Sequence, residues 1–196
     1  MDFGDSLGGI QTVDLLLILY FMAFFVLGYA QGTIRRLIGI GTILFSFFLA
    51  ANLAEPLGNY LGGNWTQFSR EYSYMIAFLS VFVASALAFA IIAQGFYKPQ
   101  PLFEKARFID EVLGGVLGVV QAGLILAFVV VILGTFFLLR GIAPDPDEIP
   151  FLRSLWEALD QSRIVDVFRD TLIPLFFALT GFLVPDSIEI LFPSPA

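Results

Sequence analysis

Few residues of this sequence could do chemistry, and the strongest candidates lie at or inside long apolar runs. Asp14, Gln94 and Gln121 are the strongly polar side chains in these positions. Polar groups are costly inside a membrane, so they mark a transport path or a hydrogen bond between helices. A proton path would need a second buried charge near Gln121, and we find none. We expect Gln121 to bond to another helix, and Asp14 to lie at headgroup level in a structural role.

Two groups of acidic residues are possible cation ligands. Asp110 and Glu111 are adjacent, and Asp145, Asp147 and Glu148 lie close together. Acidic residues in loops are more often solvated, or they cap the N-terminus of a helix, as Asp110 could for the last apolar helix. We therefore predict no metal site.

The sequence contains no cysteine and no histidine. This excludes disulfides, thiolate nucleophiles, zinc–thiolate sites and iron–sulfur clusters, together with the usual haem and zinc ligand and the usual general base. No glycine-rich phosphate loop and no serine nucleophile motif occurs. We expect no catalytic residues, no cofactor and no enzyme activity.

The composition indicates a membrane protein. Hydrophobic residues make up 58% of the chain, charged residues only 14%, and the mean hydropathy is +0.88. A soluble domain carries about 25% charged residues. The net charge of −7 disfavours nucleic acid or an anionic membrane surface as a partner. The expected partners are the lipid bilayer and other membrane proteins, or further copies of this chain.

Four apolar runs cover 13–30, 37–54, 74–97 and 112–139, and Asp14 is the only charged residue in them. Each reaches the ~17–25 residues that a helix needs to cross a bilayer. Backbone amides in hydrocarbon must bond internally, so these runs form helices, and the alternation typical of barrel strands is not seen. We predict an all-α polytopic membrane protein with four transmembrane helices in residues 1–140. The connections at 31–36 and 98–111 imply two hairpins, joined by a longer link at 55–73.

Residues 141–196 form the second predicted unit, an acidic loop followed by a C-terminal amphipathic helix. Its apolar residues recur at helical spacing: Ile164, Phe168, Leu172, Leu175 and Leu179. The apolar stretch 171–184 is too short to span a bilayer and contains Pro174. We expect it to lie along the outer membrane face or to re-enter partway, and the alternative is packing on the outer loop.

Basic residues near the membrane predict the orientation. The first and third links hold five: Arg35, Arg36, Lys98, Lys105 and Arg107. The opposite side holds three: Arg70, Arg140 and Arg153. The positive-inside rule therefore places both hairpin turns in the cytoplasm and both termini outside.

Small residues recur at a spacing that favours close helix packing. Gly114 and Gly118, extended by Ala122, share one face of the fourth span, and Gly28 and Gly32 repeat the spacing at the end of the first. Glycines four residues apart let helix backbones approach closely in lipid. We predict a helix contact at these positions, within or between subunits.

Two stretches resemble a known family. Gly32-Thr-Ile-Arg35-Arg36-Leu follows a span opened by Asp14, and Asp110-Glu111-Val-Leu-Gly114-Gly-Val-Leu-Gly118 opens the last span. With the paired layout of the spans, they resemble the colicin V production protein (CvpA) family of bacterial inner-membrane proteins over residues 13–139. The family positions that match are Asp14, Gly32, Arg35, Asp110, Gly114 and Gly118. The resemblance implies a multi-pass protein of the bacterial cytoplasmic membrane.

Three positions depart from the family pattern. Arg36 stands where the family usually has Glu, Glu111 where it usually has Arg, and Gln121 where an Arg is common. The first two departures have opposite signs, so we predict a swapped ion pair between Arg36 and Glu111 at the cytoplasmic base of the bundle. Chance substitution is the alternative.

The resemblance associates the chain with colicin V export and envelope homeostasis and gives no molecular activity. We expect a non-enzymatic membrane scaffold or accessory subunit of an envelope membrane complex. The alternative is a small oligomeric channel or transporter, with Gln121 or Asp14 lining a path.

Overall fold

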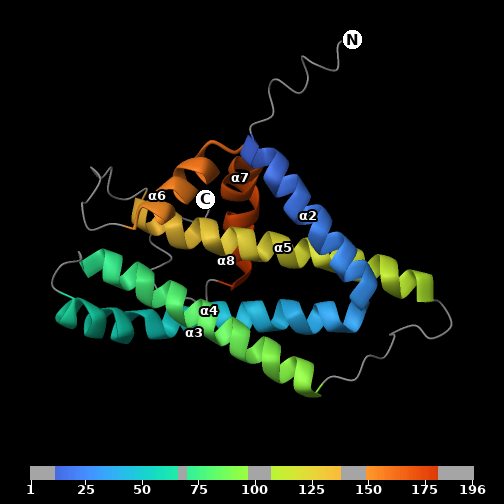
Figure 1. Ribbon diagram of the computed structural model, residues 1–196, viewed down its shortest axis with the longest axis horizontal. Helices are drawn as coiled ribbons and strands as arrows, with labels where there is room; N and C mark the ends of the chain where they lie inside the picture. The colour runs from blue at the N-terminus through green and yellow to red at the C-terminus, as the bar shows by residue number, and fades with distance from the viewer. Residues whose placement is uncertain (1–11, 66–69, 97–106, 138–148, 181–196) are drawn as a thin grey trace, which may run out of the picture.

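The computed structural model describes residues 12–65, 70–96, 107–137 and 149–180 (Figure 1). All regular structure in these ranges is helical. Four of the helices are long and apolar enough to cross a membrane: α2 (Thr12–Gln31), α3 (Thr33–Asn64), α4 (Arg70–Phe96) and α5 (Arg107–Phe137). The predicted all-α fold with four membrane spans is confirmed. The acidic residues 145–148, the basic residues at 98, 105 and 140, and both chain ends lie outside the described residues.

The second span is longer than its apolar run. α3 has 32 residues and continues to Asn64, with Pro56 inside it, where the sequence predicts a helix-breaking link. The extension packs on α4, because the ring of Tyr74 fills the place of a side chain at Gly58, and the Tyr74 hydroxyl donates to Asn59 Oδ1 at 2.7 Å. At 1.5 Å per residue α3 is about 48 Å long. It therefore exceeds the ~30 Å hydrocarbon core of a bilayer.

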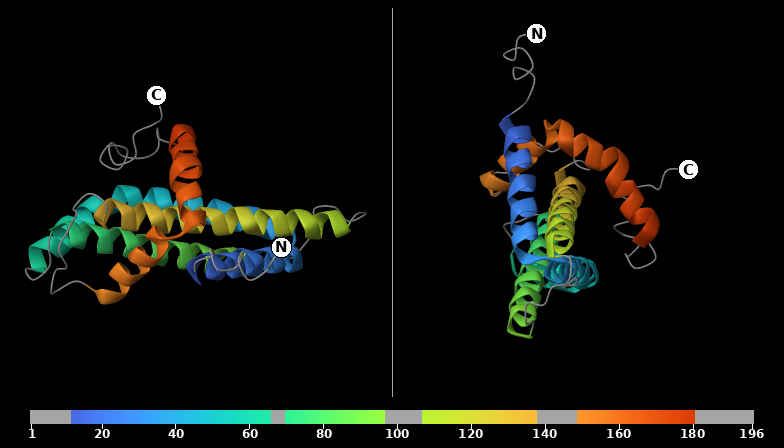
Figure 2. Two further views of the ribbon diagram at one scale, coloured as in Figure 1. Left: turned by 90° about the horizontal axis from the view of Figure 1, so that it is seen from above. Right: turned by 90° about the vertical axis from the view of Figure 1, so that its right-hand side faces the viewer.

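The structure corrects the predicted pairing of the spans. The connection between α2 and α3 is the single residue Gly32, whose φ of 77° is a conformation that glycine adopts readily. The two helices diverge from this point, and the extensive contacts join α3 with α4 and α2 with α5 (Figures 1 and 2). A short turn fixes where two helices meet but does not fix the angle between them. The surfaces of the helices decide that angle.

The contact between α2 and α5 is a backbone contact at glycines. A Cβ atom added to Gly28 would overlap the carbonyl oxygen of Gly114, and one added to Gly118 would overlap the carbonyl oxygen of Phe24. The Tyr20 hydroxyl also donates to the carbonyl of Ala122 at 3.1 Å. Only residues without a side chain allow so close an approach, and van der Waals packing then holds the helices together.

An aromatic cluster fills the centre of the bundle. Phe47 of α3 and Phe128 of α5 are buried, and their rings stack with centroids 4.0 Å apart. Phe176, from the C-terminal segment, packs edge-on against both, with centroids at 5.8 and 5.2 Å. Three elements distant in the sequence therefore share one core.

The C-terminal segment is divided into two parts, where the sequence predicts one amphipathic helix. α6 (Pro150–Asp160) precedes α7 (Arg163–Val167), a π-helical turn η1 (Phe168–Leu172) and α8 (Ile173–Thr180). The apolar face of α6 buries Leu152, Trp156 and Leu159. It lies across the ends of α4 and α5, where Trp156 stacks on Phe137 and the amide of Ile149 donates to the Tyr72 hydroxyl at 3.0 Å.

The second part crosses α5 and runs across the long axes of α3, α4 and α5 (Figures 1 and 2). Phe168 stacks on Phe21 of α2, and Phe176 reaches Phe47, which lies near the middle of α3. The C-terminal segment therefore contacts the spans themselves and not only the loops at their ends.

Replacing Gly118 by Leu should push α2 away from α5, because the new side chain would meet the backbone of Phe24. Overpacking of a close contact costs about 1–3 kcal/mol, so we expect a lower Tm in detergent and lower accumulation in the membrane. Gly41→Leu is the matched control, since a Cβ atom there meets nothing within 4 Å. Equal melting curves for the two variants would contradict the contact.

Candidate functional site

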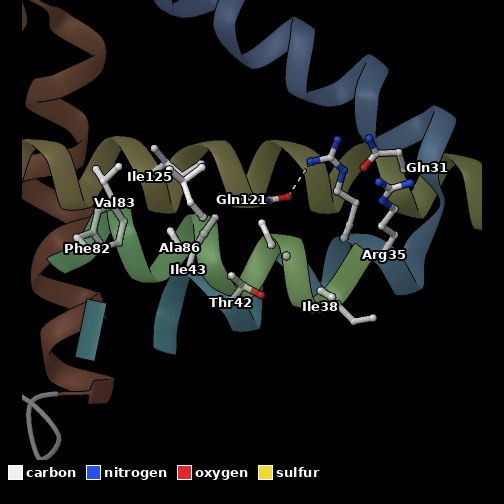
Figure 3. Close-up of a pocket in the computed structure, with 15 residues that line it drawn as sticks. Gln31, Arg35, Ile38, Thr42, Ile43, Phe82, Val83, Ala86, Gln121 and Ile125 are labelled. Carbon is white, nitrogen blue, oxygen red and sulfur yellow. Dashed lines mark hydrogen bonds between the residues drawn. The ribbon is translucent and has the colours of Figure 1, made fainter. Parts of the chain in front are cut away.

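One of the buried polar residues of the spans is an arginine. Arg36 lies in the first turns of α3, and its side chain points towards α5, where Nη1 donates to Gln121 Oε1 at 2.7 Å (Figure 3). Only 5% of Arg36 is exposed, and its guanidinium lies 5.7 Å from the centre of the Phe24 ring. Its Nε atom is buried and has no hydrogen-bond partner among the residues that the structure describes. The hydrogen bond predicted for Gln121 is thus made to Arg36.

Arg36 and Gln121 line a cavity of about 640 Å³ between α3, α4 and α5. Arg35 lies at one end of it, beside Gln31 (Figure 3). The walls are largely apolar and include Ile38, Ile43, Phe82, Val83, Leu87 and Ile125. Gly39 makes room for the amide of Gln121, because a Cβ atom at that position would lie 2.8 Å from Gln121 Nε2.

The structure gives Arg36 and Glu111 different partners, in place of the predicted ion pair. Arg36 bonds to Gln121, whereas Glu111 Oε1 accepts from Arg107 Nε at 2.9 Å. Glu111 and Gln121 are ten residues apart on α5, which is about 15 Å along a helix. A side chain held at Gln121 cannot also reach Glu111. The opposed departures from the family pattern therefore do not reflect contact between these two residues.

Asp14 joins the first span to the C-terminal segment. It is 5% exposed, and its Oδ1 accepts from Ser162 Oγ at 2.6 Å and from the amide of Ile164 at 3.4 Å. Ser162 Oγ in turn accepts from the amide of Val165 at 3.2 Å, so it caps the N-terminus of α7. Asp14 thus makes contacts that hold two segments together, and it is buried between two elements and not merely placed at headgroup level.

Ser162 is a buried structural residue of this site that sequence reasoning missed. A serine directly before an apolar-periodic segment is a helix-start signal, and it was available in the sequence. That signal predicts a cap for α7. It does not predict the bond to Asp14, because the two residues are 148 positions apart.

Asp110 lies beside the turn between α2 and α3. Because α5 begins at Arg107, Asp110 belongs to its first turn and is not the residue that caps it. Its carbonyl oxygen accepts from Thr33 Oγ1 at 3.0 Å, and a Cβ atom on Gly32 would lie 2.6 Å from its Oδ2. The family positions Gly32 and Asp110 are therefore in contact. The side chain of Gln94 lies outside the described residues.

Asp14→Ala and Ser162→Ala should each loosen the C-terminal segment. A hydrogen bond to a charged group contributes about 1.5–3 kcal/mol, so each change should lower the unfolding free energy by a similar amount. The double variant should cost less than the sum of the two single changes, because both remove the bond between Asp14 and Ser162. Asp166→Ala, at an exposed position on α7, is the control. Additive losses in melting experiments would show that the bond does not hold the segment.

Gln121→Leu should destabilise the protein by about 1–3 kcal/mol, because it removes a partner from a buried guanidinium. In double-mutant cycles Arg36→Gln should couple to Gln121→Leu and be additive with Glu111→Gln. Coupling between positions 36 and 111 would instead support the ion pair predicted from sequence.

Comparison with known proteins identifies the family. A family model described as colicin V production protein matches residues 13–173, from the start of α2 to the first residue of α8. The match covers the four spans, the Asp14–Ser162 bond and the Arg36–Gln121 bond. Neither the comparison with curated proteins nor that with solved structures gave a match. The chain is a membrane protein that belongs to the colicin V production protein family.

Proposed function

We propose that this protein is a non-enzymatic scaffold or accessory subunit of a membrane complex in the bacterial envelope. The observation that supports this most is the exposure of α2. Its buried residues are Asp14, Leu17 and Gly28, so most of its surface is free to meet lipid or another protein. Large apolar side chains on this surface include Leu15, Leu16, Leu19, Met22 and Val26.

The buried polar groups described above also fit a scaffold. Asp14 bonds to Ser162, Thr33 to the backbone of Asp110, and Arg36 to Gln121. Each bond joins segments far apart in the chain. These groups stabilise one arrangement of helices, whereas a transport path would need polar groups free to exchange partners along it.

A photo-crosslinking residue in place of Leu19 tests the scaffold proposal in native membranes. Leu19 is 60% exposed on α2, and Leu87, which is 59% exposed on α4, is the matched control. We expect discrete protein adducts from position 19 and mainly lipid adducts from position 87. If the crosslinked protein is lost from cells that lack this chain, then the stability of that protein depends on this chain. Lipid adducts alone from position 19 would contradict the proposal.

The second candidate is a small oligomeric channel or transporter, and the cavity beside Gln121 is the observation that favours it. Flux in liposomes that Gln121→Leu abolishes, while the variant keeps its helical content and detergent elution profile, would support this candidate. A purified protein that carries no flux would favour the scaffold.

We also propose that both termini face the cell exterior, on the strength of the basic residues in the first and third links. Single cysteines at Ser6, Gln31 and Ser194 test this with an impermeant thiol reagent on intact cells. Gln31 is exposed at the end of α2 and is a better probe than Thr33, which is 4% exposed. We expect labelling at positions 6 and 194 and none at 31. Labelling at 31 alone would invert the orientation.

A further inference from the structure

We propose that the cavity between α3, α4 and α5 binds an anionic phospholipid, with its phosphate at Arg36 and Arg35 and its acyl chains along the apolar walls. This goes beyond the proposed function, because a scaffold and a channel could each hold such a lipid. The inference combines the charge of the site, the exposure of its apolar lining and the length of the cavity.

The positive charge at the arginine end of the cavity is not balanced within the described residues. Arg36 is buried, and its partners are the neutral amide of Gln121 and the ring of Phe24. Arg35 lines the same space, and the described residues that line the cavity include no carboxylate. A buried cation without a counter-charge is costly, and an anion beside it would offset that cost.

The orphaned donor of Arg36 points to the same conclusion. Its Nε atom is buried and finds no hydrogen-bond partner in the described part of the chain, although its Nη1 bonds to Gln121. Guanidinium groups bind phosphate through two parallel N–H donors, and phosphate is the anion of phospholipid headgroups. The whole chain carries a net charge of −7, so this positive site is a local feature.

Part of the apolar lining of the cavity is exposed on the outside of the bundle. Val83 and Leu87 line the cavity, lie near the middle of α4, and are 45% and 59% exposed. Ile38 of α3 contributes a further exposed apolar edge. A soluble anion would gain nothing from these walls, whereas a lipid can enter sideways and bury its chains against them.

The length of the cavity also fits a lipid. Arg35 and Ile43 mark its extent on α3 and are eight residues apart. This is about 12 Å along the helix, enough for a headgroup and the first carbons of its chains. The arginine end lies beside the turn at Gly32, at the end of α2, which is where headgroups would lie if α2 and α3 cross the bilayer.

Phospholipid exchange into detergent-purified protein tests the proposal. The delipidated full chain is mixed with micelles that contain phosphatidylglycerol or phosphatidylcholine, and retained lipid is counted by native mass spectrometry. Wild-type protein should retain phosphatidylglycerol, and its Tm should rise with that lipid and not with phosphatidylcholine. Inorganic phosphate and glycerol 3-phosphate, as soluble anions, should not raise the Tm.

Two variants test the site separately. Arg36→Gln removes the charge and should weaken phosphatidylglycerol binding by about tenfold, as expected for the loss of one charge-assisted hydrogen-bond donor. Ala90→Trp fills the cavity without changing either arginine and should abolish retention. The controls are Arg163→Gln on α7 and Ala88→Trp, which are exposed positions away from the cavity lining.

The outcomes separate the alternatives. Loss of phosphatidylglycerol from Ala90→Trp, with retention in Ala88→Trp, supports the site even if Arg36→Gln does not fold. Equal retention in Ala90→Trp and wild type overturns it. An equal rise in Tm with glycerol 3-phosphate and with phosphatidylglycerol would also overturn it, because the ligand would then be a soluble anion.

Discussion

The backbone contact between α2 and α5 is the constraint on which the rest of the bundle depends. Gly28 and Gly118 let the two helices touch through their main chains, so α2 is held by α5 and not by its sequence neighbour α3. With α2 fixed there, the chain must turn at Gly32, and α3 departs towards α4. The same contact places Phe24 beside Arg36, which faces Gln121 further along α5. In lipid, where apolar side chains gain little from leaving their solvent, such close packing is a main source of helix association.

Polar bonds between distant segments then select one arrangement of the remaining elements. Asp14 bonds to Ser162 and so attaches the C-terminal segment to the start of α2, while Thr33 attaches the start of α3 to Asp110. A hydrogen bond is electrostatically stronger in a low-dielectric interior, and an unmade one is correspondingly costly. These bonds therefore specify which helix ends meet, whereas the glycines specify how closely two helices approach.

Much of this architecture could be predicted from the sequence. The number and nature of the spans follow from run length and from the need of backbone amides to bond internally. The meeting of Gly28 with Gly114 shows why small-residue spacing is informative, because it reports the shape of a helix surface. The pairing of spans was not predictable in this way, since a short turn such as Gly32 constrains helix ends and leaves the angle open. The partner of Arg36 was equally inaccessible, because it depends on the relative register of α3 and α5.

The π-helical turn η1 in the C-terminal segment affects which side chains of α8 enter the core. Pro174 is the second residue of α8, and its ring lacks an amide hydrogen and crowds the carbonyl one turn earlier. A π-helical turn from Phe168 to Leu172 precedes it and relieves that crowding. Such a turn takes up one more residue than a regular one. A regular turn would carry Phe176 roughly 100° around the helix axis, away from Phe47 and Phe128. The side of α8 that enters the core is thus determined by a proline two positions before Phe176.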